Sequence, residues 1–284
     1  MSKIAFVTDS TAYIPEKLTK AHHIKVAPQI LVWDEKTYQD GVDIQPDEFY
    51  MRLKTTKVMP TTSQVPVAIM QPIFQDLVSK GFEVLGIFIS AKLSGTLQSA
   101  IQARKALGNA GDKIFLVDSN TTAMAMGFIL LAAARAAEQG ASMEECIALA
   151  EKARAHVGVY FAVDTLEFLH RGGRIGGATR FIGSALNLKP ILALRDGRVE
   201  AEDRVRTKSK AIDRILELVS KEVNGKSNIR VATLHANAEE EARILLDRAT
   251  NEFNAIESIL SSVSPVVGVH AGPGTVGLAF MADI

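Results

Sequence analysis

Short apolar runs alternate with helical stretches along the first two-thirds of the chain. The apolar runs predict strands at residues 4–7, 24–33, 84–89 and 113–117. Helices are predicted to begin near Pro46 and near Pro66, since proline suits the first turn of a helix, and a further helix is predicted to end near residue 107. The polar segment 60–64, between the helices that begin near Pro46 and Pro66, is predicted to be a loop. This alternation of strand, loop and helix predicts a parallel sheet with helices on both faces.

The longest apolar run, residues 123–134, reads AMAMGFILLAAA and ends at Arg135. It is too short to span a bilayer, which needs about 20 residues. We therefore interpret it as part of a buried helix. Near the N-terminus, the apolar run 4–7 reaches Thr8, Asp9 and Ser10 too soon for a signal peptide. These features predict a cytoplasmic protein.

The pattern changes near residues 157–163, where a second α/β domain is predicted to begin. The expected domains are 1–161, a three-layer α/β/α unit, and 162–284, a smaller two-layer unit with a mixed sheet. The second unit is expected to contain these elements in order: a short helix 164–170, a glycine-rich loop 171–177, a hairpin of 189–194 and 198–205, helix 207–223, strand 229–234, helix 238–253, strand 256–262, a segment 268–274 and a last strand 275–281.

Composition excludes several classes of protein. Of 284 residues, 47% are hydrophobic and 23% are charged, which argues against a disordered, collagen-like or coiled-coil chain. The 32 basic and 32 acidic residues give zero net charge, so no nucleic-acid partner is predicted. Residues 169–208 nevertheless carry nine basic and four acidic residues. A solvated face is the usual explanation, but Arg171 and Arg174 lie in the glycine-rich loop, and arginine suits phosphate or carboxylate.

Metal and disulfide chemistry find no support in the sequence. Cys146 is the single cysteine, so it forms neither an internal disulfide nor a cysteine-based zinc site. His22 and His23 are adjacent and cannot share one helix face. No metal and no cofactor are predicted.

Several polar loops follow predicted strands, where ligands of open α/β sheets bind. Ser94, Gly95 and Thr96 open a helix, and a helix N-terminus attracts anions, although Ser94 could simply cap the helix. Thr61 and Thr62 offer hydroxyls that could bind a carboxylate or form only a polar turn. His270 precedes Gly272, Pro273 and Gly274 and could contact a ligand or be structural. The G-x-S-x-G motif of hydrolases and the Walker A motif are both missing.

Seven segments in this order and spacing resemble the DegV family, the fatty-acid-binding subunits of bacterial fatty acid kinase. The resemblance covers the whole chain and rests on these segments: Val7-Thr-Asp-Ser10, Pro60-Thr-Thr-Ser-Gln64, Leu93-Ser-Gly-Thr96, Val117-Asp-Ser119, Leu169-His-Arg-Gly-Gly-Arg-Ile175, Lys189-Pro-Ile191 and His270-x-Gly-Pro-Gly274.

The resemblance implies a two-domain fold with a long-chain fatty acid, such as palmitate, in a tunnel between the domains. It implies that Thr62, Ser94 and His270 hold the carboxylate, with Thr61, Gly95 and Thr96 beside them. It further implies that a separate fatty acid kinase phosphorylates the acid to acyl phosphate, and that Arg171 and Arg206 contact this partner or the acyl phosphate. The chain itself would be a carrier and not an enzyme.

Two alternatives remain open at this point. Ser94 and His270 could belong to a serine hydrolase or acyltransferase. The basic segment 169–208 could contact an anionic membrane surface or an acidic partner, which is compatible with fatty acid binding.

Overall fold

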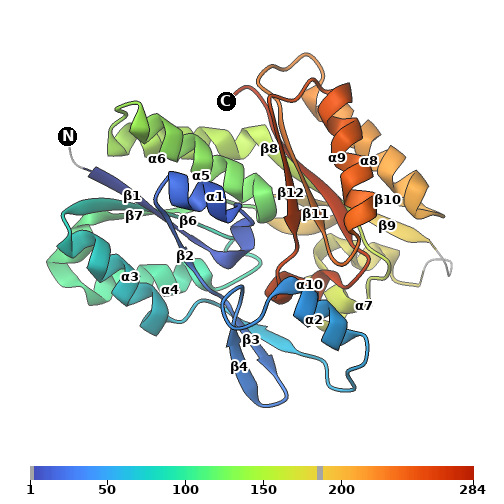
Figure 1. The fold of residues 1–284 in the computed structure, drawn as a ribbon, viewed down its shortest axis with the longest axis horizontal. Helices are drawn as coiled ribbons and strands as arrows, with labels where there is room; N and C mark the ends of the chain where they lie inside the picture. Colours follow the sequence, from blue (N-terminus) through green and yellow to red (C-terminus); the bar gives the residue numbers. More distant parts are fainter. Residues whose placement is uncertain (1–2, 184–187) are drawn as a thin grey trace.

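The computed structural model describes residues 3–183 and 188–284, which form two large sheets and one small sheet (Figure 1). The first large sheet is wholly parallel, as the alternating pattern predicted. Its order is β2 (Ile24–Ala27), β1 (Lys3–Asp9), β6 (Phe82–Phe88) and β7 (Ile114–Asp118).

Helices cover both faces of the first sheet because its strands bury alternate side chains on opposite sides. Ala5 and Val7 of β1 pack with α3 (Val67–Ser79) and α4 (Thr96–Ala106). Phe6, between them in sequence, packs in the core that contains α5 (Ala123–Glu138) and α6 (Met143–Ala153).

The second large sheet is mixed and follows the order β10-β9-β8-β13-β11-β12. Its strands are β8 (Val157–Ala162), β9 (Lys189–Arg195), β10 (Arg198–Val205), β11 (Arg230–His235), β12 (Glu257–Ser262) and β13 (Val276–Met281). The helices α8 (Lys208–Val223) and α9 (Glu239–Glu252) cover one face. The predicted division between residues 161 and 162 falls within β8, whose residues pair with β9 and β13 and so belong to this second sheet.

The helix α5 is shared by the two large sheets. It contacts β1 and β6 of the first sheet and also β8, β11 and β13 of the second (Figure 1). Eleven of its sixteen residues are buried, which confirms the buried helix predicted from the run 123–134. The two sheets therefore pack on opposite sides of one apolar helix.

The predicted single strand 24–33 is wrong, because the chain divides at Pro28 into β2 and β3 (Ile30–Trp33). Proline has no N–H to donate to a ladder, so it favours a break between strands. The strand β3 joins a different sheet, between β4 (Lys36–Gln39) and β5 (Thr61–Ser63). The segment 60–64 predicted as a loop therefore contains a short strand, drawn at the bottom of Figure 1.

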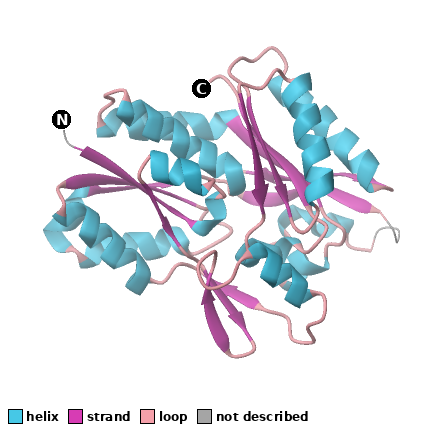
Figure 2. Cartoon of the chain, viewed as in Figure 1, coloured by secondary structure: helices cyan, strands magenta, loops and turns pink. Residues whose placement is uncertain are grey.

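Short helices connect the longer elements, as the secondary-structure colouring of Figure 2 shows, and α2 and α7 pack against α10. The α-helices are α1 (Glu16–Ala21), α2 (Pro46–Leu53), α7 (Glu167–Arg171) and α10 (Pro265–Ala271). The 3-10 helices are η1 (Ser10–Ala12), η2 (Gly108–Lys113), η3 (Arg154–His156) and η4 (Gly176–Phe181). The helix α10, which carries His270, was not predicted from the sequence.

Candidate functional site

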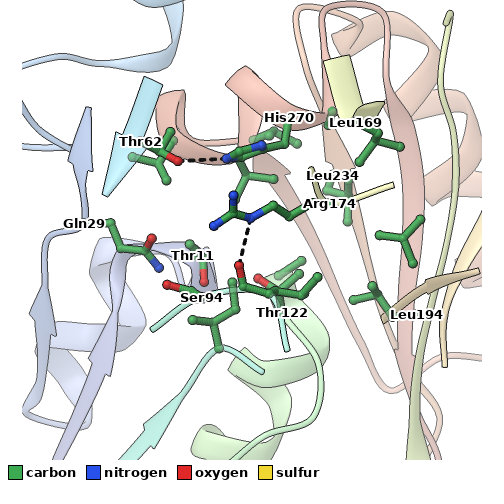
Figure 3. Close-up of a pocket in the computed structure, with 18 of the residues that line it drawn as sticks. Thr11, Gln29, Thr62, Ser94, Thr122, Leu169, Arg174, Leu194, Leu234 and His270 are labelled. Carbon is green, nitrogen blue, oxygen red and sulfur yellow. Dashed lines mark hydrogen bonds between the residues drawn. The ribbon is translucent and has the colours of Figure 1, made fainter. Parts of the chain in front are cut away.

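A cavity of about 230 Å³ lies between the two large sheets, bordered by β5, α10 and the loop before α4. One side is polar and includes Thr62, Ser94 and His270, whereas the other side is apolar (Figure 3). The apolar side chains come mainly from the second sheet and α7: Val159, Phe161, Leu169, Leu194, Val199 and Leu234. A cavity of this kind suits an elongated apolar ligand with one polar end.

Asp9, at the end of β1, organises the wall nearest the first sheet. One carboxylate oxygen accepts hydrogen bonds from the Thr11 N–H (3.0 Å), the Thr11 hydroxyl (2.6 Å) and the Gln29 amide (3.3 Å). The other oxygen accepts from the Ile89 N–H at 2.9 Å. Burial raises the pKa of Asp9 above its ordinary value, while these hydrogen bonds oppose the increase. Because Thr11, Gln29 and Ile89 all line the cavity, Asp9 fixes the shape of this wall.

The loop before α4 brings Ser94 and Gly95 to the polar side of the cavity. The Ser94 hydroxyl lies 3.0 Å from the Thr96 hydroxyl and accepts a 3.3 Å hydrogen bond from the Thr96 N–H. A Cβ at position 95 would lie 2.0 Å from Oε1 of Gln64, so a larger residue there would displace the Gln64 side chain. The buried Thr96 hydroxyl accepts from the Val65 N–H at 3.3 Å, so Thr96 fastens the loop and does not border the cavity.

Thr62 and His270 meet on the polar side although they are far apart in sequence. Thr62 lies on β5, and its Oγ1 is 2.8 Å from Nε2 of His270, at the end of α10. The Nδ1 atom of His270 is buried without a hydrogen-bond partner and faces Gly172, where a Cβ would lie 2.0 Å away. Gly172 therefore allows the imidazole ring to occupy this position.

Burial, with a smaller contribution from the positive charge of Arg174, lowers the pKa of His270 to about 4. His270 is therefore neutral at neutral pH. A buried N–H without an acceptor is costly, so we assign the proton to Nε2, which then donates to Thr62. In this arrangement the Thr62 hydroxyl keeps its own proton, which it can donate to an anionic ligand.

Arg174 is the arginine that lines the cavity (Figure 3). Its Nε donates to the Leu93 carbonyl at 3.1 Å and its Nη1 donates to the Gly172 carbonyl at 2.8 Å, so it joins the glycine-rich loop to the Ser94 loop. Arg171 is exposed and pairs with Glu167, one helical turn earlier, and Arg206 is exposed as well. Neither lines the cavity.

The structure brings together half of the residues singled out from the sequence. Thr62, Ser94, Gly95 and His270 line the cavity. Thr61 is exposed, Thr96 is buried beneath the loop, and Arg171 and Arg206 are exposed and do not line the cavity. The functional roles assigned to these residues stay predictions.

Gln29, Gln64 and Arg174 line the cavity, although they were not assigned to the site from the sequence. Gln29 had a visible signal, since it is a polar residue beside Pro28 within an otherwise apolar run. The sequence also contained an argument against Arg171 as a site residue. Glu167 and Arg171 have the spacing of a helical ion pair, which indicates that Arg171 is engaged elsewhere.

The geometry gives little support to a serine hydrolase. A Ser–His catalytic pair needs a hydrogen bond from the serine to the imidazole, and a carboxylate on the other ring nitrogen. Ser94 pairs with Thr96, His270 pairs with Thr62, and Nδ1 of His270 has no partner in the described part of the chain.

Asp40 holds the other end of the helix that carries His270. The buried carboxylate accepts from the Ser10 hydroxyl at 2.6 Å and from the Val266 N–H, in the first turn of α10, at 3.2 Å. Burial raises its pKa to about 6 from 3.8, with a smaller contribution from the charge of Asp9 and opposition from the hydrogen bonds.

We expect the Asp40→Asn variant to remove a pH dependence of stability. The folded state binds the Asp40 proton more tightly than the unfolded state does. Protonated Asp40 therefore stabilises the fold below about pH 4, and this stabilisation is lost as pH rises through about 6. This contribution amounts to about 3 kcal/mol. Urea unfolding between these pH values should show the unfolding free energy of the wild type falling relative to the variant as pH rises. If the difference in unfolding free energy between the wild type and Asp40→Asn did not change with pH, the raised pKa of Asp40 would be contradicted.

No helix in the described residues is long and apolar enough to cross a membrane. Within residues 3–183 and 188–284 there is also no cluster of histidine, cysteine, aspartate or glutamate that could hold a metal ion.

The chain belongs to the DegV family: it matches the family described as "Uncharacterised protein, DegV family" over residues 3–283. It is 36% identical to Protein DegV of Bacillus subtilis over 278 residues, which cover 98% of each chain. The resemblance inferred from the seven segments is therefore confirmed.

Solved structures agree with this membership. A DegV family protein from Thermus thermophilus, described by its fatty acid binding, superposes with a TM-score of 0.93 at 34% identity and 99% coverage of both chains. A stearic acid-binding protein from Eubacterium ventriosum superposes with a TM-score of 0.91 at 26% identity, covering 99% of this chain and 98% of its own. The predicted fold class, α/β with a parallel and a mixed sheet, is confirmed.

Proposed function

We propose that this protein binds a long-chain fatty acid in the cavity between its two large sheets. The observation that carries the proposal is the Thr62–His270 pair, which leaves a hydroxyl proton available on the polar side of an otherwise apolar cavity. Ser94 supplies a second hydroxyl on the same side. An ionised carboxylate accepts hydrogen bonds only, so these groups suit its two oxygens. Fatty acid binding by the Thermus and Eubacterium relatives supports the same assignment.

The apolar side would supply most of the affinity. Each methylene removed from water contributes about 0.8 kcal/mol before entropic costs. The side chains of the second sheet and α7, with Leu169, Leu194 and Leu234 among them, would contact the acyl chain. The carboxylate contacts would set the orientation.

We further propose that the protein is a carrier that presents the carboxylate to a fatty acid kinase, which forms the acyl phosphate. The glycine-rich turn at 172–177 follows α7 and not a strand, so it does not match a nucleotide phosphate loop. Arg174 lies at the polar side and is exposed, which would leave the carboxylate within reach of a partner. The exposed Arg171 and Arg206 are the residues we assign to this partner or to a transient membrane contact.

The test separates carrier from enzyme. Delipidated protein incubated with palmitic acid and ATP is expected to yield no acyl phosphate until a bacterial fatty acid kinase is added. Acyl phosphate formation by this chain alone would overturn the carrier role. Mass spectrometry of lipid extracted from the purified protein should find a long-chain fatty acid, and a fluorophosphonate probe should not label Ser94.

A further inference from the structure

A groove of about 800 Å³ lies on the other side of one cavity wall. It is bordered by α1, β2, the end of β12 and the start of α10. Of the described residues, Tyr13 is the only one that borders both the groove and the cavity. The segment after β12 continues the wall, since Val263 and Val266 border the cavity whereas Ser264 and Pro265 border the groove.

Tyr13 adopts a backbone conformation that a bulky residue rarely takes. Its φ of 56° and ψ of 24° lie in the left-handed region, which glycine would occupy without strain. Two contacts hold the segment in place. The Ser261 hydroxyl donates to the Tyr13 carbonyl at 3.2 Å, and η1 packs so closely on α5 that a Cβ on Gly127 would lie 2.9 Å from the Ala12 carbonyl oxygen.

The side chain of Tyr13 also carries an unusual cost. Its hydroxyl is buried and makes no hydrogen bond of good geometry, and the same is true of the Ser264 hydroxyl. Burial raises the pKa of Tyr13, and the nearby Ser264 opposes the increase. Strained backbone and unpaired buried hydroxyls persist where the surroundings require them. Tyr13 lies where the cavity and the groove come together.

The groove could receive an acyl chain if this wall were opened. Its lining includes the apolar side chains of Ile14, Ile24, Val26 and Leu260. Val26 is 43% exposed, so apolar surface is available there without unfolding any element.

We propose that Tyr13 is the partition residue that closes the acyl cavity against this groove, and that it thereby limits the length of the acyl chain the protein accepts. The inference rests on the proposed fatty acid binding. A small side chain at position 13 would join the two spaces, and the groove would then take the end of a longer saturated chain.

The experiment compares delipidated wild-type protein with Tyr13→Ala, Tyr13→Gly and Tyr13→Phe. Dissociation constants for palmitic and arachidic acids are measured by displacement of a fluorescent fatty acid. In Tyr13→Ala the preference for arachidic over palmitic acid should rise about tenfold, because the added methylenes reach apolar surroundings. Tyr13→Phe keeps the ring and should retain the wild-type preference. Tyr13→Gly relieves the backbone strain and guards against a folding defect in the alanine variant.

A second substitution tests the role of the groove itself. In the Tyr13→Ala background, Val26→Phe fills the groove from an exposed position and should restore the wild-type preference. An unchanged preference in both small-residue variants, with palmitic acid still bound, would overturn the partition role. If the wild-type protein binds neither acid, the proposed function fails, and that result is distinct from a failure of the partition.

Discussion

A double variant carrying Thr62→Val and Ser94→Ala is expected to bind palmitic acid at least about 100-fold more weakly than the wild type, because hydrogen bonds to a charged group contribute about 1.5–3 kcal/mol each. Both hydroxyls lie on the polar side of the cavity, and Thr62 is already oriented by His270 at 2.8 Å. The apolar contacts remain, so binding should weaken without being abolished. Titration calorimetry on delipidated protein measures the effect.

The chain offers a matched control for this experiment. Thr61 is adjacent to Thr62 on the same strand but is exposed and does not line the cavity. Thr61→Val removes the same hydroxyl chemistry and should leave the affinity unchanged. Equal affinities for the double variant and the wild type, with equal thermal unfolding temperatures, would refute the assignment of the carboxylate to Thr62 and Ser94.

The second large effect concerns stability. Replacing Asp9 with alanine is expected to lower the free energy of unfolding by about 3 kcal/mol or more, because it leaves buried donors without an acceptor. The Thr11 N–H, the Ile89 N–H and the Gln29 amide all donate to this one carboxylate. Chemical denaturation measures the change.

Asp118 provides the comparison, since it ends strand β7 of the same sheet in a similar way. Its carboxylate accepts from the Asn120 N–H at 2.9 Å and from the Ala91 N–H at 3.3 Å, but it is only half-buried. Asp118→Ala should therefore cost about 1 kcal/mol, since water can replace the lost bonds. Equal losses for the two alanine variants would contradict a special role for Asp9.

The parts of the fold that could be predicted from sequence are those with strong periodic patterns. The buried helix α5 and the parallel strands of the first sheet follow from apolar runs alone. Shorter elements escaped prediction for local reasons. Pro28 divides one apolar run between two sheets, and α10 is only seven residues long with a Gly-Pro-Gly segment close behind it.

The site residues also divide into those that could be predicted from the sequence and those that could not. Thr62, Ser94 and His270 belong to segments that carry the family resemblance, and the structure places all three on the cavity. Gln29 and Arg174 depend on tertiary packing, because they reach the cavity through contacts with Asp9 and with the Leu93 carbonyl. Such contacts join segments far apart in the chain, so a local pattern can mark Gln29 as an unusual polar residue without showing what it contacts.

The sharing of α5 has a consequence for how the protein can be divided. Phe6 and Leu85 of the first sheet lie in the same apolar core as Val159 and Leu234 of the second. A fragment that ends near residue 161 would keep α5 but expose the face that the second sheet covers, and the remaining fragment would lose its covering helix. The two halves are therefore expected to unfold in a single transition, and neither is a candidate for independent expression.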